Sequence, residues 1–371
     1  MRSADLCVVG ASYAGLACAT AAAANGLSVC ILDAKAQVGE RPHTTGILVE
    51  EAMAQLPGLP SALVRPVKGV RLYSPSLRSF DLFSKGYSFY ACDTPGLLRW
   101  MAADFLQHDA AQIVTGARFS RADTVPTGFR LSDHNLRTRF IVGADGARSA
   151  VGRHFGLSAN REFLIGMELE FAGHNFLDER FLHVFVDSVL APGYIAWVVP
   201  GVGITQVGLA CRHPAHLNIE QLLQKLRPLC DFSAATCIGR RGGLIPVGGT
   251  VDRFAAPGVL LVGDAAGMVS PLTAGGIHKA LELGGLAGHA IADHLCNAAP
   301  DPGQVLATAA PQYRCKKWLR RCANRGVPNQ LLEGVFTNSM FQRFAQLVFF
   351  HHRGLLGRDG WQALLGRDAG H

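Results

Sequence analysis

The N-terminal part of the chain alternates short apolar runs with Gly-rich turns and Ala-rich stretches. Residues 5–10 predict a buried strand, residues 10–25 a helix that ends near Gly26, and residues 27–33 a second strand. Strand, turn, helix and strand form a βαβ unit, which implies a parallel sheet. Later segments of the same character are strands at 139–143 and 259–264 and a long helix at 276–295.

Residues 163–211 show a different pattern, in which Phe, Val, Leu and Ile recur in short runs. This pattern predicts a second, largely antiparallel sheet. A helix with Pro95 in its first turn, where a missing N–H is tolerated, is expected at 94–107. The expected strands of the second sheet are 163–171, 181–190, 194–199 and 204–211, followed by a helix at 219–226.

Composition fits a well-packed intracellular protein. Hydrophobic residues make up 49% of the chain and charged residues 17%, so we expect a large core. The ten cysteines form no Cys-x-x-Cys pair, which suits a reducing compartment better than a disulfide framework. No apolar run approaches the ~20 residues of a membrane-spanning helix, and no signal segment precedes Gly10. We therefore expect a cytoplasmic location.

The net charge of +7 is concentrated near the C-terminus. Residues 311–371 contain ten Lys or Arg and three Asp or Glu, which accounts for the whole excess. Two interpretations stay open for this basic segment: a solvated surface, or peripheral contact with anionic lipid or a diphosphate-bearing substrate. Five apolar residues at helical spacing either close the core or form an apolar lid at a membrane surface: Phe336, Met340, Phe344, Leu347 and Val348.

The first motif that indicates chemistry is Gly10-Ala11-Ser12-Tyr13-Ala14-Gly15. A dinucleotide site needs a turn tight enough to bring helix amides onto a pyrophosphate. Gly10 supplies the turn and Gly15 permits close helix–strand packing, while Ser12 stands where Gly is usual. Asp33 ends the second strand, 23 positions after Gly10. That spacing is close to the ~20 residues expected for an acid that binds ribose hydroxyls.

The most specific segment is 259–267, a predicted buried strand that delivers Asp264 to its carboxyl end. Ligands bind at that end of a parallel sheet, and a carboxylate there can accept a hydrogen bond from a ribityl hydroxyl. Gly275 and Gly276 open the long helix, whose amides can then face a flavin pyrimidine and stabilise negative charge on the reduced ring. A third motif, residues 143–149, places Asp145 in a turn after a strand.

In this order and at these separations, the three motifs resemble the FAD enzymes that include aromatic hydroxylases and geranylgeranyl reductases. Residues 143–153 (GADGARSAVGR) and 263–277 (GDAAGMVSPLTAGGI) are most similar to the geranylgeranyl reductase branch. Residues 192–200 (PGYIAWVVP) are similar to a stretch that lies near the substrate cavity in that branch. The branch usually carries a Cys-containing segment where this chain has residues 41–46, which contain no Cys.

The resemblance implies bound FAD and a transient electron donor, NAD(P)H or another reductant. Tyr194 and Trp197 would line a substrate cavity, with core packing as the alternative. Tyr194 and Thr45 are also candidates for the acid that protonates the substrate. The implied cofactor residues are Gly10, Ser12, Tyr13, Ala14, Gly15, Asp33, Ala34, Arg41, Asp145, Gly263, Asp264, Pro271, Gly275 and Gly276.

The favoured function is an FAD-dependent oxidoreductase that acts on a small hydrophobic substrate of isoprenoid or lipid type. In that reaction flavin N5 delivers hydride to a C=C bond. The alternatives are a monooxygenase that uses NAD(P)H and O₂ and, from another class, a non-redox flavoprotein cyclase. We expect no nucleic-acid partner. We also expect no metal site, because His213 and His216 are three residues apart and no Cys-x-x-Cys pair accompanies them.

The expected fold is α/β, with a Rossmann-type FAD-binding domain of the glutathione reductase type. A mainly antiparallel β-sheet substrate domain is inserted into it, and the C-terminus is helical. The expected bounds are 1–62, 94–160 and 250–300 for the FAD-binding domain, 63–93 and 161–249 for the substrate domain, and 301–371 for the C-terminal segment.

Overall fold

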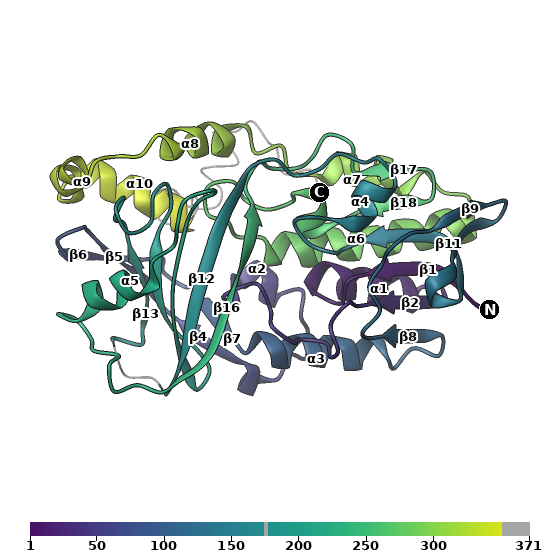
Figure 1. The fold of residues 1–371 in the computed structure, drawn as a ribbon, viewed down its shortest axis with the longest axis horizontal. Helices are drawn as coiled ribbons and strands as arrows, with labels where there is room; N and C mark the ends of the chain where they lie inside the picture. Colours follow the sequence, from purple (N-terminus) through teal and green to yellow (C-terminus); the bar gives the residue numbers. More distant parts are fainter. Residues whose placement is uncertain (174–176, 351–371) are drawn as a thin grey trace. The chain divides into compact units, whose positions relative to one another are not determined.

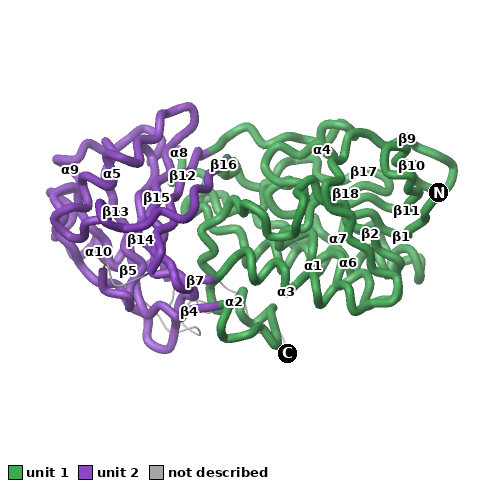
Figure 2. The backbone as a smooth tube through the Cα atoms, turned by 60° about the horizontal axis from the view of Figure 1, so that its bottom comes forward, with its two compact units in different colours: residues 1–63, 93–163, 244–320 green, residues 64–92, 164–243, 321–371 purple. Residues whose placement is uncertain are grey.

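The computed structural model describes residues 1–173 and 177–350 and divides the chain into two compact units (Figure 2). Unit 1 comprises Met1–Leu63, Asp93–Phe163 and Leu244–Arg320. Unit 2 comprises Val64–Cys92, Leu164–Gly243 and Arg321–His371, of which the described part ends at Phe350. The segment 301–371, which was expected to form a separate C-terminal part, is thus divided between the two units after Arg320. The expected domain bounds stay a prediction.

Unit 1 is built on an eight-stranded sheet whose central strands are parallel (Figure 1). Its strands are β1 Arg2–Val9, β2 Val29–Leu32, β8 Ala111–Val114, β9 Asp123–Val125, β10 Gly128–Leu131, β11 Leu136–Gly143, β17 Ala255–Ala256 and β18 Val259–Leu261. The order is β17-β18-β11-β1-β2-β8, and β10 and β9 extend antiparallel from β11. Strands β2 and β18 and the C-terminal halves of β1 and β11 are buried, as their runs of apolar residues predict.

Two helices pack closely on each other beside this sheet (Figure 1). The helix α1 spans Tyr13–Ala24, and α6 spans Ile277–Asn297. They approach closely because Gly284 and Gly288 of α6 meet the backbone of α1, with no room for a Cβ. The other helices of unit 1 are α2 Glu50–Met53, α3 Thr94–Phe105, α4 Ala150–His154 and α7 Pro302–Ala309, and α8 Arg314–Asn324 begins in this unit.

The helix α3 illustrates how local sequence sets these elements. Asp93 precedes it, and its side chain accepts a hydrogen bond from the Gly96 amide at 3.0 Å. Pro95 lies in the first turn, where its missing N–H costs nothing. Both signals are visible in the sequence, and the predicted helix at 94–107 is confirmed within two residues.

Unit 2 contains a seven-stranded sheet of order β16-β12-β15-β14-β13-β5-β6. The strands are β5 Gly69–Tyr73, β6 Ser79–Phe83, β12 Phe163–Ala172, β13 Phe181–Phe185, β14 Ala196–Pro200, β15 Ile204–Arg212 and β16 Cys237–Pro246. Strands β12, β15, β14 and β13 pair antiparallel in succession, as do β5 and β6, whereas β13 and β5 are parallel. The helix α5, Ile219–Leu226, packs Leu222 and Leu226 into the core on one face of this sheet. The predicted fold class is thereby confirmed.

Strand β13 is shorter than the predicted strand 181–190. It ends at Phe185 because Asp187 turns the chain: its carboxylate accepts hydrogen bonds from the amides of Val189 and Leu190, at 2.9 and 3.2 Å. A separate antiparallel pair in unit 2 is formed by β4 Val64–Val67 and β7 Phe89–Cys92.

The C-terminal apolar residues do not share one helix face, so that expectation was wrong. Helix α9 spans Asn329–Phe336 and α10 spans Ser339–Phe350. The break arises at Asn338, whose side chain accepts a hydrogen bond from the Met340 amide at 2.8 Å and starts a new helix. Phe336 is buried, whereas Met340 and Phe344 are 77% and 43% exposed.

All ten cysteines are free. In the part of the chain that the structure describes, no helix combines the length and apolar character needed to cross a membrane. Nor do the described residues contain a group of three or more His, Cys, Asp or Glu side chains arranged to hold a metal ion.

Candidate functional site

The carboxyl ends of four neighbouring parallel strands in unit 1 carry the sequence motifs. Gly10 follows β1, Asp33 follows β2, Asp145 follows β11, and Asp264 follows β18. Because the strand order is β18-β11-β1-β2, these residues lie along one edge of the sheet. Open parallel sheets bind their ligands at this edge, so it is the candidate cofactor site.

Gly10 makes the turn after β1 with a φ of +107°, an angle that residues with a side chain rarely adopt. A Cβ on Gly10 would lie 2.4 Å from the Ala144 carbonyl oxygen, and a Cβ on Gly15 would lie 1.9 Å from the Gly10 carbonyl oxygen. Neither position has room for a side chain. The helix α1 therefore starts directly at the edge of the sheet.

The N-terminus of α1 fits the pyrophosphate of FAD. Ser12 is the residue that precedes the helix, yet its side chain makes no capping hydrogen bond, and the first turn contains no acidic residue. The first turn of the helix therefore carries no side-chain anion of its own, although the Asp33 carboxylate bonds the Ala11 amide just before it. Tyr13 and Ala14 are buried in this first turn, and Ala14 lies against Gly263.

Asp33 joins two turns at the edge of the sheet. One carboxylate oxygen accepts a hydrogen bond from the Ala11 amide at 2.6 Å, and the other accepts one from the Lys35 amide at 2.8 Å. The side chain is buried, so these bonds fix its orientation before any ligand contributes. Ala34 and Arg41 lie on the exposed loop that follows, and the Arg41 side chain is 86% exposed.

Asp145 holds the start of α4, whose N-cap is Ser149. Its carboxylate accepts hydrogen bonds from the Ser149 hydroxyl at 2.6 Å and from the amides of Ala150 and Val151 at 2.6 and 3.1 Å. A contact of Asp145 with a cofactor would be additional to this structural role.

Asp264 keeps its carboxylate available. Its side chain is partly exposed but surrounded closely enough by protein atoms that desolvation raises its pKa to about 6. Among the described residues, none donates a hydrogen bond to this carboxylate. The group therefore fits an acceptor for a hydroxyl of a bound nucleotide, which would relieve the cost of its burial.

One polar residue at this site could not be found from the sequence. Asn160 donates hydrogen bonds to the Asp264 carbonyl oxygen at 2.8 Å and to the Ala147 carbonyl oxygen at 3.0 Å. It thereby ties the segment after β18 to the segment after β11. Asn160 lies outside every motif, and only the three-dimensional structure reveals this link.

The segment 270–276 forms a tight loop before α6. The Ser270 amide donates to the Gly275 carbonyl oxygen at 3.0 Å, and the Ala274 amide donates to the Ser270 carbonyl oxygen at 2.9 Å. Pro271 is buried in this loop. Gly276 precedes α6 without a side-chain cap, so the helix start fits an electron-rich group such as a flavin carbonyl.

In unit 2, Trp197 on β14 is held in a buried polar cluster. Its indole N–H donates to the Glu168 carboxylate at 2.8 Å, and Gln206 donates to the same carboxylate at 3.1 Å. The Arg241 guanidinium lies 3.3 Å from Glu168 and also pairs with Glu170. The ring packs against Gly208 on β15. Its orientation is therefore fixed by an ion-paired network that the motif alone did not reveal, although a Glu inside a predicted strand was a signal.

The two candidate acids lie in different units. Thr45 belongs to unit 1, and Tyr194 belongs to unit 2, just before β14. The roles of both in proton transfer stay predictions.

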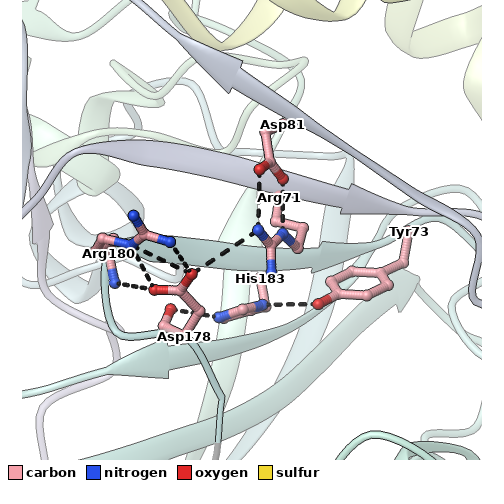
Figure 3. Close-up of polar contacts among 6 residues, drawn as sticks. All are labelled: Arg71, Tyr73, Asp81, Asp178, Arg180 and His183. Carbon is pink, nitrogen blue, oxygen red and sulfur yellow. Dashed lines mark hydrogen bonds and ion pairs between the residues drawn. The ribbon is translucent and has the colours of Figure 1, made fainter.

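A second polar cluster in unit 2 surrounds a buried histidine (Figure 3). One ring nitrogen of His183 bonds the Asp178 carbonyl oxygen at 2.9 Å, and the other bonds the Tyr73 hydroxyl at 3.0 Å. Because a carbonyl only accepts, Nε2 carries the proton and Tyr73 donates to Nδ1. Burial lowers the pKa of His183 to about 4. Arg71, paired with Asp81, lies close by and disfavours a charged imidazole.

Several large apolar side chains of α9 and α10 in unit 2 are exposed. Leu331 and Val335 are spaced one turn apart on α9, as are Met340 and Phe344 on α10, and their exposed fractions run from 41% to 77%. Within residues 321–350, three arginines are also exposed: Arg321, Arg325 and Arg343. The basic residues beyond Phe350 lie outside the described residues.

Comparison with known proteins agrees with this geometry. Residues 8–55 match a family model described as an NAD(P)-binding Rossmann-like domain. The chain is 30% identical over 306 residues to digeranylgeranylglycerophospholipid reductase 2 of Methanosphaera stadtmanae, covering 78% of this chain and 77% of the relative. A similar match, 30% over 315 residues, is found with the corresponding reductase 2 of Methanopyrus kandleri, over 78% of this chain and 77% of that one.

Among solved structures, a geranylgeranyl bacteriochlorophyll reductase-like protein from Thermoplasma acidophilum superposes with a TM-score of 0.81. The identity is 20%, over 90% of this chain and 91% of that one. At 20% identity, this structural similarity shows that the two proteins share a fold.

Proposed function

Because the chain belongs to the geranylgeranyl reductase family of FAD-dependent oxidoreductases, we propose that it reduces C=C bonds in the isoprenoid chains of a phospholipid. The observation that carries this proposal is the likeness, over most of both chains, to reductases of digeranylgeranylglycerophospholipids. The cofactor site at the carboxyl edge of the unit 1 sheet supplies the chemistry that such a reaction needs.

When bound and reduced, FAD supplies a hydride for one carbon of the double bond. In our proposal the N-terminus of α1 holds the pyrophosphate, Asp33 binds a ribose hydroxyl, and Asp264 accepts a hydrogen bond from the ribityl chain. The start of α6 at Gly275 and Gly276 faces the flavin pyrimidine and stabilises negative charge there. These assignments place the nucleotide along the strand edge.

The other carbon of the double bond must take up a proton, so that hydride and proton together add two hydrogen atoms to the bond. We propose Tyr194 or Thr45 as the donor, and Trp197 as a wall of the cavity that holds the isoprenoid chain. The network of Glu168 and Arg241 fixes the indole, so Trp197 meets the substrate as a rigid surface. The electron donor is NAD(P)H or another reductant that binds transiently.

The test is anaerobic turnover of the FAD-loaded protein with dithionite and digeranylgeranylglycerophospholipid, followed by mass spectrometry of the lipid. Reduction adds two hydrogen atoms for each double bond, so the lipid mass rises in steps of ~2 Da. The proposal is contradicted if oxygen atoms enter the lipid in air, as a monooxygenase requires. It is equally contradicted if the lipid mass never changes, as expected of a non-redox cyclase.

We also propose that unit 2 touches the membrane from which such a lipid is taken. The exposed apolar residues of α9 and α10, with Arg321, Arg325 and Arg343, suit an anionic lipid surface. Apolar side chains enter the boundary of the bilayer, and arginines attract its anionic headgroups.

A further inference from the structure

Asn160 is a polar residue of unit 1 that lies outside every motif, yet it joins two segments of the candidate cofactor site. Its Nδ2 atom donates hydrogen bonds to the carbonyl oxygens of Asp264 and Ala147, at 2.8 and 3.0 Å. Because carbonyl oxygens only accept, the nitrogen of the side-chain amide must face them. Among side chains of this size, only the Asn amide supplies two N–H donors from one atom.

The oxygen atom of the same amide gains nothing from this position. Oδ1 of Asn160 is buried, and among the described residues none donates a hydrogen bond to it. A buried acceptor without a partner costs stability. A role in filling space therefore does not explain an amide here, and the two bonds that Nδ2 donates are the reason to look for one.

The segment that carries Asn160 is held on both sides. On one side, the Ser158 amide donates to the Arg253 carbonyl oxygen at 2.8 Å, and the Arg253 amide donates to the Ser158 hydroxyl at 3.1 Å. On the other side, the Val247 amide donates to the Glu162 carbonyl oxygen at 2.9 Å. Asn160 thus makes its bonds from a backbone that is fixed at either end.

The Asp264 carbonyl is the group through which Asn160 can orient the Asp264 carboxylate. This carbonyl accepts one hydrogen bond from Asn160 and another from the Gly267 amide, at 3.1 Å. Gly267 is itself confined, since a Cβ there would lie 2.6 Å from Asn160 Oδ1 and 2.5 Å from the Gly249 carbonyl oxygen. Two donors fix the plane of the peptide after Asp264, and with it the direction in which the side chain leaves the backbone.

The second acceptor of Asn160 lies in the segment that adjoins the first cofactor motif. Ala147 follows β11, and the Ala144 carbonyl of the same segment leaves no room for a side chain on Gly10. One amide therefore connects the turn that carries Asp264 to a segment that is packed against the turn at Gly10.

We propose that Asn160 is a positioning residue for FAD, whose two hydrogen bonds hold the Asp264 carboxylate in place relative to the turn at Gly10. One nucleotide can then meet both groups at once. Asn160 acts through Asp264 and the backbone, and we assign it no contact with the cofactor. The inference rests on the part of the proposed function that assigns this edge of the sheet to FAD.

The test is a double-mutant cycle on FAD affinity, built from Asn160→Ala, Asp264→Asn and the variant that combines them. We expect Asn160→Ala alone to raise the Kd for FAD about tenfold, because the carboxylate loses its orientation. In the Asp264→Asn background, the same change should raise Kd less than about twofold, because the group that Asn160 orients is already lost. Equal factors in both backgrounds would show that Asn160 does not act through Asp264, and would overturn the inference.

Two further variants separate hydrogen bonding from packing. Asn160→Asp keeps the size of the side chain and removes both N–H donors, so its Kd for FAD should rise at least as much as that of Asn160→Ala. The control is Asn297→Ala, which removes an exposed amide elsewhere in unit 1 and should bind FAD as the wild type does. Wild-type affinity in Asn160→Asp would mean that the side chain only fills space, which contradicts our proposal.

A measurement on the protein without FAD tests the same idea independently of binding. The amides of Gly267 and Met268 bond the carbonyls of Asp264 and Gly263, so they report on this turn. In Asn160→Ala and Asn160→Asp they should exchange with deuterium about tenfold faster than in the wild type, while strand β15 of unit 2 is unchanged. Wild-type exchange in both variants would overturn the positioning role. If the cycle and the exchange behave as predicted but the protein reduces no lipid, the proposed lipid reduction is wrong and the role of Asn160 is supported.

Discussion

His183 shows at the residue scale how the fold controls a protonation state. The imidazole is buried, and its two nitrogens bond the Asp178 carbonyl and the Tyr73 hydroxyl (Figure 3). Protonation would bring a second N–H against the Tyr73 hydroxyl and place a charge near Arg71. The folded protein therefore favours the neutral ring, with a pKa of about 4.

This shift predicts a stability that depends on pH. Because the pKa of folded His183 lies below its ordinary value of 6.5, its contribution is complete above pH 6.5 and is lost as the pH falls toward 4. Between pH 7 and pH 5, His183 should lower the free energy of unfolding by about 2 kcal/mol. The measurement is urea unfolding at both pH values, followed by tryptophan fluorescence.

The matched variants are His183→Gln, which cannot titrate, and His289→Gln at an exposed position. The first should lose most of this pH-dependent difference, and the second should keep it. If His183→Gln and the wild type lose the same stability between pH 7 and pH 5, our account of the buried imidazole is wrong.

At the scale of elements, α9 and α10 present their apolar side chains to solvent on one side and bury Leu332, Phe336 and Phe350 on the other. Glu333 holds α9 on unit 2. Its carboxylate forms an ion pair with Arg78 and accepts hydrogen bonds from the amide and hydroxyl of Ser76. The helix therefore keeps exposed apolar side chains even though it is packed on unit 2. Packing in the protein core does not explain these exposed residues.

We predict that the Met340→Ser/Phe344→Ser variant binds vesicles containing anionic lipid at least tenfold more weakly than the wild type. Each large apolar side chain contributes about 1.5–3 kcal/mol when removed from water. Co-sedimentation with vesicles at low salt measures this, and Val189→Ser, another exposed apolar position of unit 2, is the control. Absence of wild-type binding at low salt would refute the membrane contact.

Elements with a strong local signal were predictable from the sequence. Helix α5 coincides with the predicted range 219–226, because its apolar residues repeat at helical spacing and Asn218 caps it. The end of β13 and the break between α9 and α10 were not predictable. Each depends on a single side chain, Asp187 or Asn338, that bonds nearby backbone amides in a geometry that periodicity does not reveal.

The same distinction holds for the candidate site. The motif glycines and acids could be found because backbone approach and phosphate binding restrict residue type at fixed spacing. Asn160 and the Glu168–Arg241 pair could not be placed, since they join segments far apart in the sequence. Their partners become neighbours only when the sheets form.

At the scale of the whole molecule, the parallel sheet of unit 1 brings four distant segments to one edge. Neither the turn at Gly10 nor the carboxylate of Asp264 is a site by itself. The strand order β18-β11-β1-β2 makes them parts of one edge, with Asn160 fixing the segment that carries Asp264. Unit 2 contributes a sheet whose Trp197 is rigidly held.

The central claim is that this edge binds one FAD per chain and that Asp264 accepts a hydrogen bond from it. The ionised carboxylate is the better acceptor, and its pKa near 6 means that most of it is protonated at pH 5. FAD should therefore bind about tenfold more weakly at pH 5 than at pH 7. Without FAD, the raised pKa also means that the stability contribution of Asp264 is complete below pH 3.8 and is lost as the pH rises through 6.

The most direct measurement is FAD titration, followed by flavin absorbance and fluorescence, of the wild type, Asp264→Asn and the exposed control Asp252→Asn at pH 5 and pH 7. We predict one FAD per wild-type and control chain with the stated pH dependence. Asp264→Asn should bind FAD at least tenfold more weakly at pH 7, with no such dependence. A wild type that takes up no FAD, or an Asp264→Asn variant with wild-type affinity at both pH values, would contradict the account.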